Sequence, residues 1–397
     1  MVSITIFLAA ILFFMNLFGQ TIQTAVIYQQ HRAVAVKCSD LLDTMLLSPG
    51  SPENWSVRED PIVGFGLQDP EFTQYQLSPF SLMRLTPSNG PPVYYPKTDM
   101  TYYNLTMDFG QSLYVPYTQI VNYSIASRLL GINGTYGFSL TVTPIVDVTV
   151  TPNVQPNLLT FSISAVGPGF PLAHAEVSYC FLTVDAQGQY PDYEIEYGNV
   201  TTDATGFASV VFSGFDASQV SHAFLAYAHL QGLTGMGYYM HELENENSVV
   251  PFVSNFETGE VLLAHSWDVH GGDNPALVHY NATFVVLNED FRLGNMTLQN
   301  ETMVGRLTHG LGNPYDCIII NTYTPGILIV TYRITGHQTG VVMMPWGINA
   351  MAFSVTFGGN LQNQEWVATD MRQVTVNNMA YQAKLALWST QGYQVNG

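Results

Sequence analysis

The first 19 residues form one apolar run, with thirteen large apolar side chains and no charged residue. About 20 helical residues are needed to cross the ~30 Å hydrocarbon layer of a membrane. From Gln20 to Ser48 the chain has neither Pro nor Gly. Apolar residues recur there at nearly helical spacing, at Ile22, Val26, Ala33, Val36, Leu41 and Met45. The pattern predicts one continuous helix over residues 1–48, about 70 Å long and ended by Pro49-Gly50.

The first half of this helix is predicted to be apolar on all sides and the second half on one side only. An apolar stripe has to be buried against another element, which is either the rest of the chain or neighbouring helices. The Asn16 amide needs a hydrogen-bond partner in an apolar environment, from a neighbouring subunit or from its own helix backbone. The residues expected to pack between subunits are Ile4, Phe7, Leu8, Ile11, Leu12, Phe14, Met15, Asn16 and Phe18.

After Trp55 the pattern changes to short alternating runs separated by Pro, Gly and Asn, such as Thr160–Ala165 and Ile327–Thr335. Such runs predict antiparallel β-sandwiches, and no alternation of strands with helices is seen. The final run, Tyr381–Trp388, fits a strand or a helix, and we favour a strand. The predicted fold class is α+β, a long N-terminal apolar helix followed by tandem antiparallel sandwiches. The predicted units are 1–48, 49–153, 154–252 and 253–397, and the aromatic side chains and Met343–Trp346 are expected in their cores.

The charge balance is strongly acidic, with 11 Lys and Arg against 30 Asp and Glu and a formal net charge of -19. No Lys or Arg occurs between Arg128 and Arg292, where there are 17 carboxylates. A surface of this sign repels phosphate backbones, so we expect no nucleic-acid partner. The three cysteines, Cys38, Cys180 and Cys317, are expected to be buried free thiols; a Cys180–Cys317 disulfide is the alternative.

Eight N-x-S/T sequons indicate an exported, glycosylated chain. They lie at Asn54, Asn104, Asn122, Asn133, Asn199, Asn281, Asn295 and Asn300. The first basic residues, Arg32 and Lys37, follow the apolar run, and by the positive-inside rule this would leave the body in the cytoplasm. The conflict disappears if a short basic leader preceded Met1 and was removed, which is the arrangement we expect.

A processed apolar N-terminus, a long helix and a β-rich glycosylated body resemble archaeal type IV pilins, whose class III leaders are cut on the cytoplasmic side of the apolar segment. The segments Ser39–Trp55 and Gly64–Pro70 are similar to the helix exit of archaeal pilin-like surface proteins, as is Leu129–Pro144. The resemblance covers about the first 150 residues. It implies a helical homopolymer whose helices form the core, with the subunit inserted in the membrane before assembly.

Residues 154–252 resemble the immunoglobulin-like and carboxypeptidase-regulatory-like domains of surface proteins. The resemblance rests on the turn at Pro168–Pro171 and on the Thr202–Gly206 segment between two strands. It implies a tight turn in which Asp203 caps backbone amides and Gly206 adopts a positive φ.

Candidate chemistry is sparse. His265 and His270, with two nearby carboxylates, are possible metal ligands, and Glu242, Glu244 and Glu246 are possible Ca²⁺ ligands; in both places we favour polar surface. The chain has no G-x-S-x-G, Walker or H-E-x-x-H motif, so we expect no enzyme, cofactor or metal.

Three functions compete on these grounds. They are a filament subunit, a non-polymerising anchored adhesin or S-layer-associated glycoprotein, and a secreted enzyme with an anchor. The one-sided helix beyond membrane length favours the filament subunit. Residues 253–397, farthest along the chain from the helix, are expected to form its outermost adhesive surface.

Overall fold

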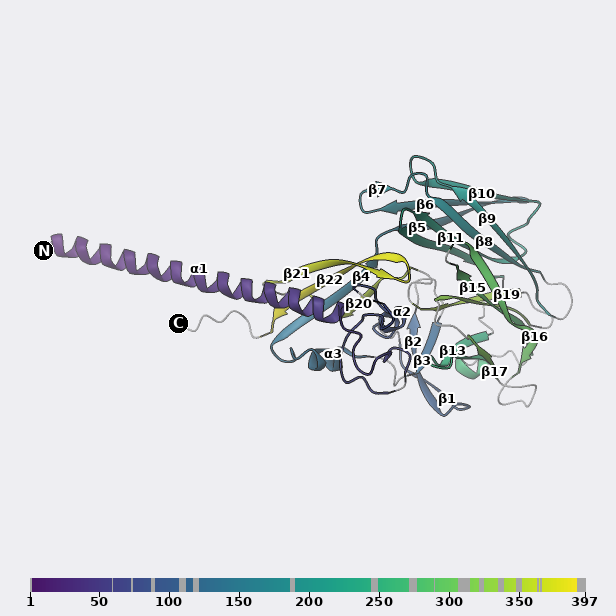
Figure 1. The fold of residues 1–397 in the computed structure, drawn as a ribbon, viewed down its shortest axis with the longest axis horizontal. Coiled ribbons are helices and arrows are strands. Elements are labelled where there is room, and N and C mark those ends of the chain that lie inside the picture. The colour runs from purple at the N-terminus through teal and green to yellow at the C-terminus, as the bar shows by residue number, and fades with distance from the viewer. Residues whose placement is uncertain are drawn as a thin grey trace.

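The computed structural model shows a long helix that projects from a β-rich body (Figure 1). It describes residues 2–58, 60–72, 74–86, 90–106, 112–116, 121–185, 190–243, 249–270, 277–288, 290–305, 315–320, 325–334, 339–347, 352–362, 364 and 366–390. The helix α1 (Val2–Leu46) has 45 residues, so the predicted element is confirmed over nearly its whole length. Short helices are α2 (Pro79–Met83), α3 (Tyr123–Leu129) and α4 (Trp267–His270). The α+β fold class is therefore the observed one.

Helix α1 ends where Pro49-Gly50 had predicted. Gly50 has φ 81°, which a residue with a side chain rarely adopts. The chain then folds back against the end of the helix, and the Trp55 indole donates a hydrogen bond to the Gly66 carbonyl (2.9 Å). A Cβ at Gly66 would collide with the Ser48 carbonyl oxygen, so a glycine is needed at this close approach.

Only part of the apolar stripe predicted on the second half of α1 is buried against the body. Leu41 and Met45 are fully buried against the body, whereas Ile22, Val26, Ala33 and Val36 are exposed. The side that the body covers is made of Val34, Cys38, Leu41, Leu42, Met45 and Leu46. Periodicity gave the spacing of the stripe, but α1 has apolar residues on two sides, and only the packing decides which side the body covers.

The strands form five sheets. The first has the order β1 (Val93–Tyr95), β2 (Met100–Thr106), β3 (Ser112–Pro116), β13 (Val249–Asn255), β14 (Glu260–His265), β17 (Tyr315–Ile319). The second is β10 (Phe207–Ser213), β6 (Leu158–Gly167), β5 (Asp147–Gln155), with β7 (Phe170–Pro171) beside β6. The third is β12 (Leu233–His241), β11 (Ser221–Leu230), β8 (Glu176–Asp185), β9 (Asp192–Thr201).

The fourth sheet has the order β16 (Leu293–Val304), β15 (Val278–Leu287), β18 (Gly326–Ile334), β19 (Thr339–Trp346). The fifth has the order β20 (Val355–Gly358), β4 (Tyr136–Pro144), β22 (Met379–Ser389), β21 (Ala368–Val376). Nearly all pairings are antiparallel; β3 and β13 run parallel where Tyr114 faces Phe252. The predicted strand at Tyr381–Trp388 is confirmed as part of β22.

The sheets do not follow the predicted unit boundaries. The second and third sheets share an apolar core that matches the predicted 154–252 unit, apart from β5, which begins at Asp147. In contrast, segments 49–153 and 253–397 build common sheets, because β4 pairs with β20 and β22 while β3 pairs with β13. The predicted boundary after residue 252 falls inside β13. Alternating residues predict that a strand exists, but they do not name its partner.

Two local predictions in the body are confirmed. Met343, Met344 and Trp346 are buried in the main core. In the Thr202–Gly206 turn, one Asp203 oxygen accepts hydrogen bonds from the Thr205 and Phe207 amides (2.7 and 3.1 Å), and Gly206 has φ 81°. A hydrogen bond from the Thr205 hydroxyl, together with these two amide hydrogen bonds, lowers the pKa of Asp203.

All three cysteines are free thiols, so the alternative of a Cys180–Cys317 disulfide is wrong. Cys38 and Cys180 are buried as expected. Cys317 is exposed on β17, contrary to the expectation of burial. The sheet topology explains why Cys180 and Cys317 do not pair and why Cys317 is exposed. Cys180 lies in β8 of the third sheet, whereas Cys317 lies on the edge strand of the first sheet.

Candidate assembly surface

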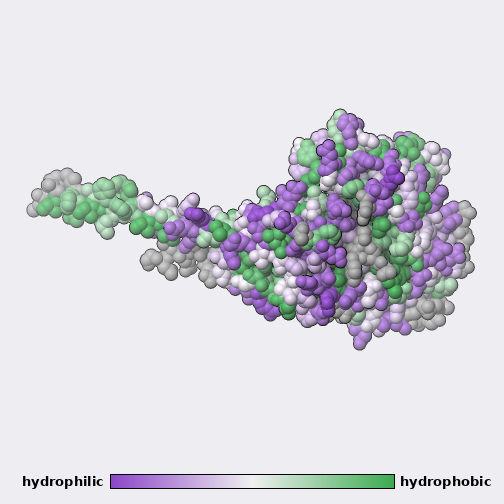
Figure 2. All heavy atoms as spheres, viewed as in Figure 1, coloured by the Kyte–Doolittle hydropathy of each residue, from purple (hydrophilic) through white to green (hydrophobic). Residues whose placement is uncertain are grey.

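The N-terminal part of α1 exposes a continuous run of large apolar side chains. On the face shown in Figure 2, hydrophobic residues predominate on the distal half of the helix and mixed residues lie near the body. Phe7 and Phe18 are each 67% exposed, and Ile11, at 40%, is still far from buried. The other predicted packing residues, Ile4, Leu8, Leu12, Phe14, Met15 and Asn16, are exposed as well. An exposed apolar surface of this extent marks a protein or membrane contact.

In the described part of the chain, α1 is the one helix long and apolar enough to span a membrane. Residues 1–30 contain no charged side chain. At 1.5 Å per residue they extend about 45 Å, which equals the thickness of a bilayer including its headgroups. The first charged side chains, Arg32 and Lys37, lie just beyond this length.

The polar side chains of α1 differ in how they are satisfied. The hydroxyls of Thr21 and Thr24 donate to the carbonyls four residues earlier, Leu17 and Gln20, at 2.8 Å. Across the described residues, the Asn16 side chain has no comparable bond to its own helix. Asn16 therefore does not bond to its own helix backbone, which was one of the two alternatives. Its amide is available to a group outside the chain, which was the other.

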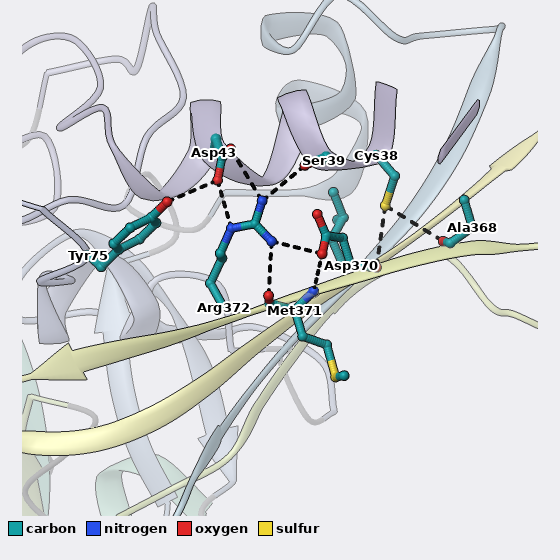
Figure 3. A network of polar contacts seen from close by, with 9 residues as sticks. Cys38, Ser39, Asp43, Tyr75, Ala368, Asp370, Met371 and Arg372 are labelled. Atoms are coloured by element: carbon teal, nitrogen blue, oxygen red, sulfur yellow. Dashed lines mark hydrogen bonds and ion pairs between the residues drawn. The ribbon is translucent and has the colours of Figure 1, made fainter. Parts of the chain in front are cut away.

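The other end of α1 is attached to strand β21 by a polar network centred on Arg372 (Figure 3). The guanidinium of Arg372 donates to both carboxylate oxygens of Asp43 (3.0 and 3.3 Å) and to the Ser39 hydroxyl (3.0 Å). It also donates to Asp370 on its own strand (2.8 Å). The Tyr75 hydroxyl adds a bond to Asp43 at 3.3 Å. A fork of this kind fixes the rotation of α1 about its axis, because two helical turns are held at once.

The thiol of Cys38 lies beside this network and faces the sheet. Its sulfur donates to the carbonyls of Leu385 (3.5 Å) and Ala368 (3.7 Å). Burial, with a smaller contribution from Asp370, raises the pKa of Cys38 to about 11, so the thiol stays protonated and unreactive at neutral pH. The hydrogen bonds that Arg372 donates to Asp370 and Asp43 raise the pKa of its guanidinium, so its charge is permanent.

An aromatic contact holds α1 about two turns before this network. The His31 ring stacks on Trp366 with ring centroids 4.1 Å apart and an interplanar angle of 2°. Residues 31–46 are thus fixed to the body, whereas the helix before His31 projects away from it (Figure 1).

Replacing Arg372 by Met is expected to lower the free energy of unfolding by about 1–2 kcal/mol, because Asp43 loses its partner at a partly exposed position. Chemical denaturation measures the change. The matched control is Lys384→Met, an exposed cation on the neighbouring strand that faces Met371, and it should change stability by less than about 0.5 kcal/mol. An equal loss in both variants would contradict the attachment role of Arg372.

Six of the eight predicted glycosylation residues are exposed, at Asn54, Asn122, Asn133, Asn199, Asn295 and Asn300. Asn104 is partly buried in β2. Asn281 is only 3% exposed, and it donates to the Pro191 carbonyl (2.6 Å) and accepts from the Glu301 amide (2.7 Å). A glycan cannot be attached to this amide in the folded chain. Asn281 therefore has a structural role through its hydrogen bonds. The three-residue sequon pattern alone does not distinguish such a residue from a glycosylation site.

We expect glycopeptide analysis of native protein to find sugar at several exposed sequons, Asn133 among them, and to find Asn281 unmodified. The physical reason is access, since the Asn133 side chain is exposed in a turn and the Asn281 amide is used inside the fold. Sugar on Asn281, or no sugar on any exposed sequon, would contradict this expectation.

The candidate metal residues are not brought together among the described residues, where no group of three or more His, Cys, Asp or Glu side chains could hold an ion. His265 is buried, and its Nδ1 accepts a hydrogen bond from the Trp267 amide (3.1 Å). A Glu242 oxygen accepts from the Val341 amide at 3.2 Å. Glu244, Glu246 and the side chain of His270 lie outside the described residues.

The C-terminal segment is divided between the two ends of the body, because β16 lies at the end far from α1 while β21 and β22 lie beside the helix (Figure 1). Strands β21 and β22 lie directly against α1, and Cys38 and Arg372 join them (Figures 1 and 3). Deleting residues 253–397 would remove these contacts and both partners of β4, the strands β20 and β22. Part of the expected adhesive module, β21 and β22, therefore attaches the helix to the body, and we expect such a deletion to unfold the body.

Comparison with known proteins gives no family. No protein-family description matches the chain, and no curated protein is significantly similar to it. Among solved structures, CsgH of R. palustris matches 24% of this chain and 91% of its own, at 15% identity and a TM-score of 0.18. Red sea bream transglutaminase matches 62% of this chain and 41% of its own, at 9% identity and a TM-score of 0.18. Similarity at this level assigns neither a fold nor a function.

Proposed function

We propose that the chain is the structural subunit of an extracellular filament of the archaeal type IV pilus kind. In this proposal α1 packs against copies of itself in the filament core, and the β body, carrying N-linked glycans, forms the outer surface. Before assembly the apolar half of α1 is inserted in the membrane. The filament serves adhesion, without a catalytic site.

The observation that carries the proposal is the exposed length of α1. About 20 residues suffice for a membrane anchor. The helix continues without a break to Leu46, and beyond residue 20 it still exposes Ile22, Val26 and Val36 on the side that the body leaves uncovered. A second copy of the helix would cover this side. A simple membrane anchor does not explain why apolar residues continue beyond the membrane-spanning length.

The energy of the apolar side chains supports the same conclusion. Thirteen large apolar residues, at about 1.5–3 kcal/mol each, correspond to an upper estimate of about 20–40 kcal/mol for transfer out of water. The free helix is therefore not stable in water. Transfer from lipid to a bundle of identical helices exchanges one apolar environment for another, so extraction during assembly has a small net cost.

The alternative is a singly anchored adhesin or S-layer-associated glycoprotein. To test between the two, native surface material is sheared from cells, sedimented, and examined by negative-stain electron microscopy, with mass spectrometry to identify the chain. We expect filaments that still sediment in mild detergent. Complete release of the protein as monomers by mild detergent would support the anchored alternative and overturn the filament proposal.

A further inference from the structure

A polar pocket lies where the chain leaves α1 and folds back along the body. Its volume is about 470 Å³, within the range of small-molecule sites. The buried residues Ser56, Ser78 and Phe80 form its floor, and segment 69–72, Glu257 and Asn377 form its rim. No part of the assembly surface described above uses this pocket.

The floor of the pocket offers a hydroxyl donor. The Ser56 and Ser78 oxygens lie 3.3 Å apart, and the Ser78 oxygen also accepts from the Ser81 amide (3.3 Å). Two hydroxyls carry two protons, and their mutual bond uses one. Among the described residues the second proton has no acceptor, so a ligand oxygen in the pocket would satisfy it.

The rim presents an aromatic ring on a fixed loop. Phe72 is 50% exposed, although a ring of its size is normally covered. Its backbone is held by two hydrogen bonds, from the Gln68 side chain to the Phe72 carbonyl (3.0 Å) and from the Phe72 amide to the Asp69 carbonyl (3.2 Å). A bond from the Asp69 amide to the Gln76 carbonyl (2.9 Å) closes the loop. The backbone that carries the ring is therefore held in place before any ligand arrives.

The charge of the pocket restricts its ligand. Asp69, Glu71 and Glu257 contribute three carboxylates. The cation at the rim, Arg58, is already paired with Asp60 at 2.9 Å. A pocket of this sign repels phosphates, uronic acids and other anions. It accepts neutral or positively charged ligands, and burial raises the pKa of Asp69 within it.

We propose that this pocket binds a non-acidic sugar residue, neutral or amino. The Phe72 ring packs against the apolar C–H face of the sugar, and the rim carboxylates and amides accept and donate hydrogen bonds to its hydroxyl or amino groups. The serine pair on the floor donates to a ring or hydroxyl oxygen. This inference rests on the proposed surface location, where such sugars are accessible.

Two sources can supply the same sugar chemistry. One is a glycan on another cell or surface, which would make the pocket an adhesive site. The other is a glycan of this protein, because the sequon residue Asn54 lies on the pocket rim. In the second arrangement the sugar would cover the fold-back segment of its own chain or of a neighbour.

The test is calorimetric titration of the full-length protein, dispersed in detergent, with three oligosaccharides. The probes are N-acetylchitotriose (neutral), chitotriose (amino) and trigalacturonate (acidic). We expect the first two to bind and the acidic one not to bind. Phe72→Ala should weaken binding at least tenfold, whereas Phe207→Ala, which removes a ring of matching exposure (51%) on β10, should leave it unchanged.

Titration before and after removal of the protein's own glycans separates the two sources. Tighter binding after their removal identifies a glycan of the protein as the occupant, and unchanged binding identifies an external sugar. No binding of either non-acidic sugar, equal losses in the two Phe variants, or binding of a lysine-rich peptide alone would overturn the proposal. Because the subunits are dispersed, sugar binding is measured independently of filament formation, and either proposal can fail without the other.

Discussion

Replacing Ile11 by Asp is expected to abolish filament assembly. Ile11 lies in the middle of the exposed apolar segment of α1, and a carboxylate there would be buried without a partner in a core of packed helices. An unpaired charge in such an environment costs several kcal/mol per subunit, which is a factor of about 100 or more in each contact. Because every subunit of a filament carries the change, the yield of sedimenting fibres should fall to background.

Two control variants separate assembly from other effects. Ile11→Leu keeps an apolar side chain and should assemble normally. Ile319→Asp places the same charge at a residue of the body that is 57% exposed on β17, and it should assemble normally as well. Membrane fractionation shows whether the Ile11→Asp chain is still inserted. Normal fibre yield from Ile11→Asp would refute the core position of this residue.

The stability of the folded body is expected to fall between about pH 6.5 and pH 4. Burial lowers the pKa of His222 to about 4, from 6.5 for an exposed imidazole. His222 is 1% exposed and is surrounded by aromatic side chains. Its Nδ1 is 2.8 Å from the Val220 carbonyl oxygen, and the centroid of the His241 ring is 5.1 Å from its own. His241 has a lowered pKa for the same reason, burial. The His222 ring is therefore neutral in the native state at pH values well above 4.

The sign of the effect follows from proton binding. Above pH 6.5 the imidazole of His222 is neutral in both the folded and the unfolded chain, and the lowered pKa has no effect on stability. Below that pH the unfolded chain binds a proton that the folded chain does not, so the free energy of unfolding decreases. The loss reaches about 2–3 kcal/mol near pH 4, where the folded state also begins to bind the proton.

Chemical denaturation at pH 7.5 and 4.5 measures this loss. His222→Phe fits the surrounding aromatic cluster, which includes Phe161, Phe181 and Phe215, and it should reduce the pH dependence between the two conditions. His174→Asn, at an exposed position with φ 60°, should leave the pH dependence as it is in the natural chain. The same pH dependence in His222→Phe as in the natural chain would exclude His222 as its source.

Local features of the fold followed from the sequence, and long-range ones did not. The 45-residue helix and the Asp203 turn depend on neighbouring residues, so spacing alone predicted them. The pairing of β4 with β22 joins residues more than 200 positions apart, and alternation carries no information on such partners. The prediction of the buried stripe on α1 was partly wrong for the same reason, since the body packs against the side that carries Val34 and Cys38.

The candidate site shows the same division. The exposed residues from Ile4 to Phe18 were predictable, because a helix that is apolar on all sides can bury its surface only in a membrane or against other helices. The Arg372 network was not, since its members are 329 positions apart in the chain. The pocket beside Phe72 was missed as well, because its lining residues come from segments 54–58, 69–80 and from Glu257, Pro325 and Asn377, which are far apart in the chain.

The most direct test of the account is a helical reconstruction, by cryo-electron microscopy, of the surface material sheared from native cells. The account predicts a central bundle of parallel copies of α1, with residues 4–30 packed against other copies and the β body outside. Asn16 should lie within hydrogen-bond distance of a neighbouring subunit. A fibre in which α1 lies on the outside, or native material in which the chain occurs only as single membrane-anchored copies, would contradict the account.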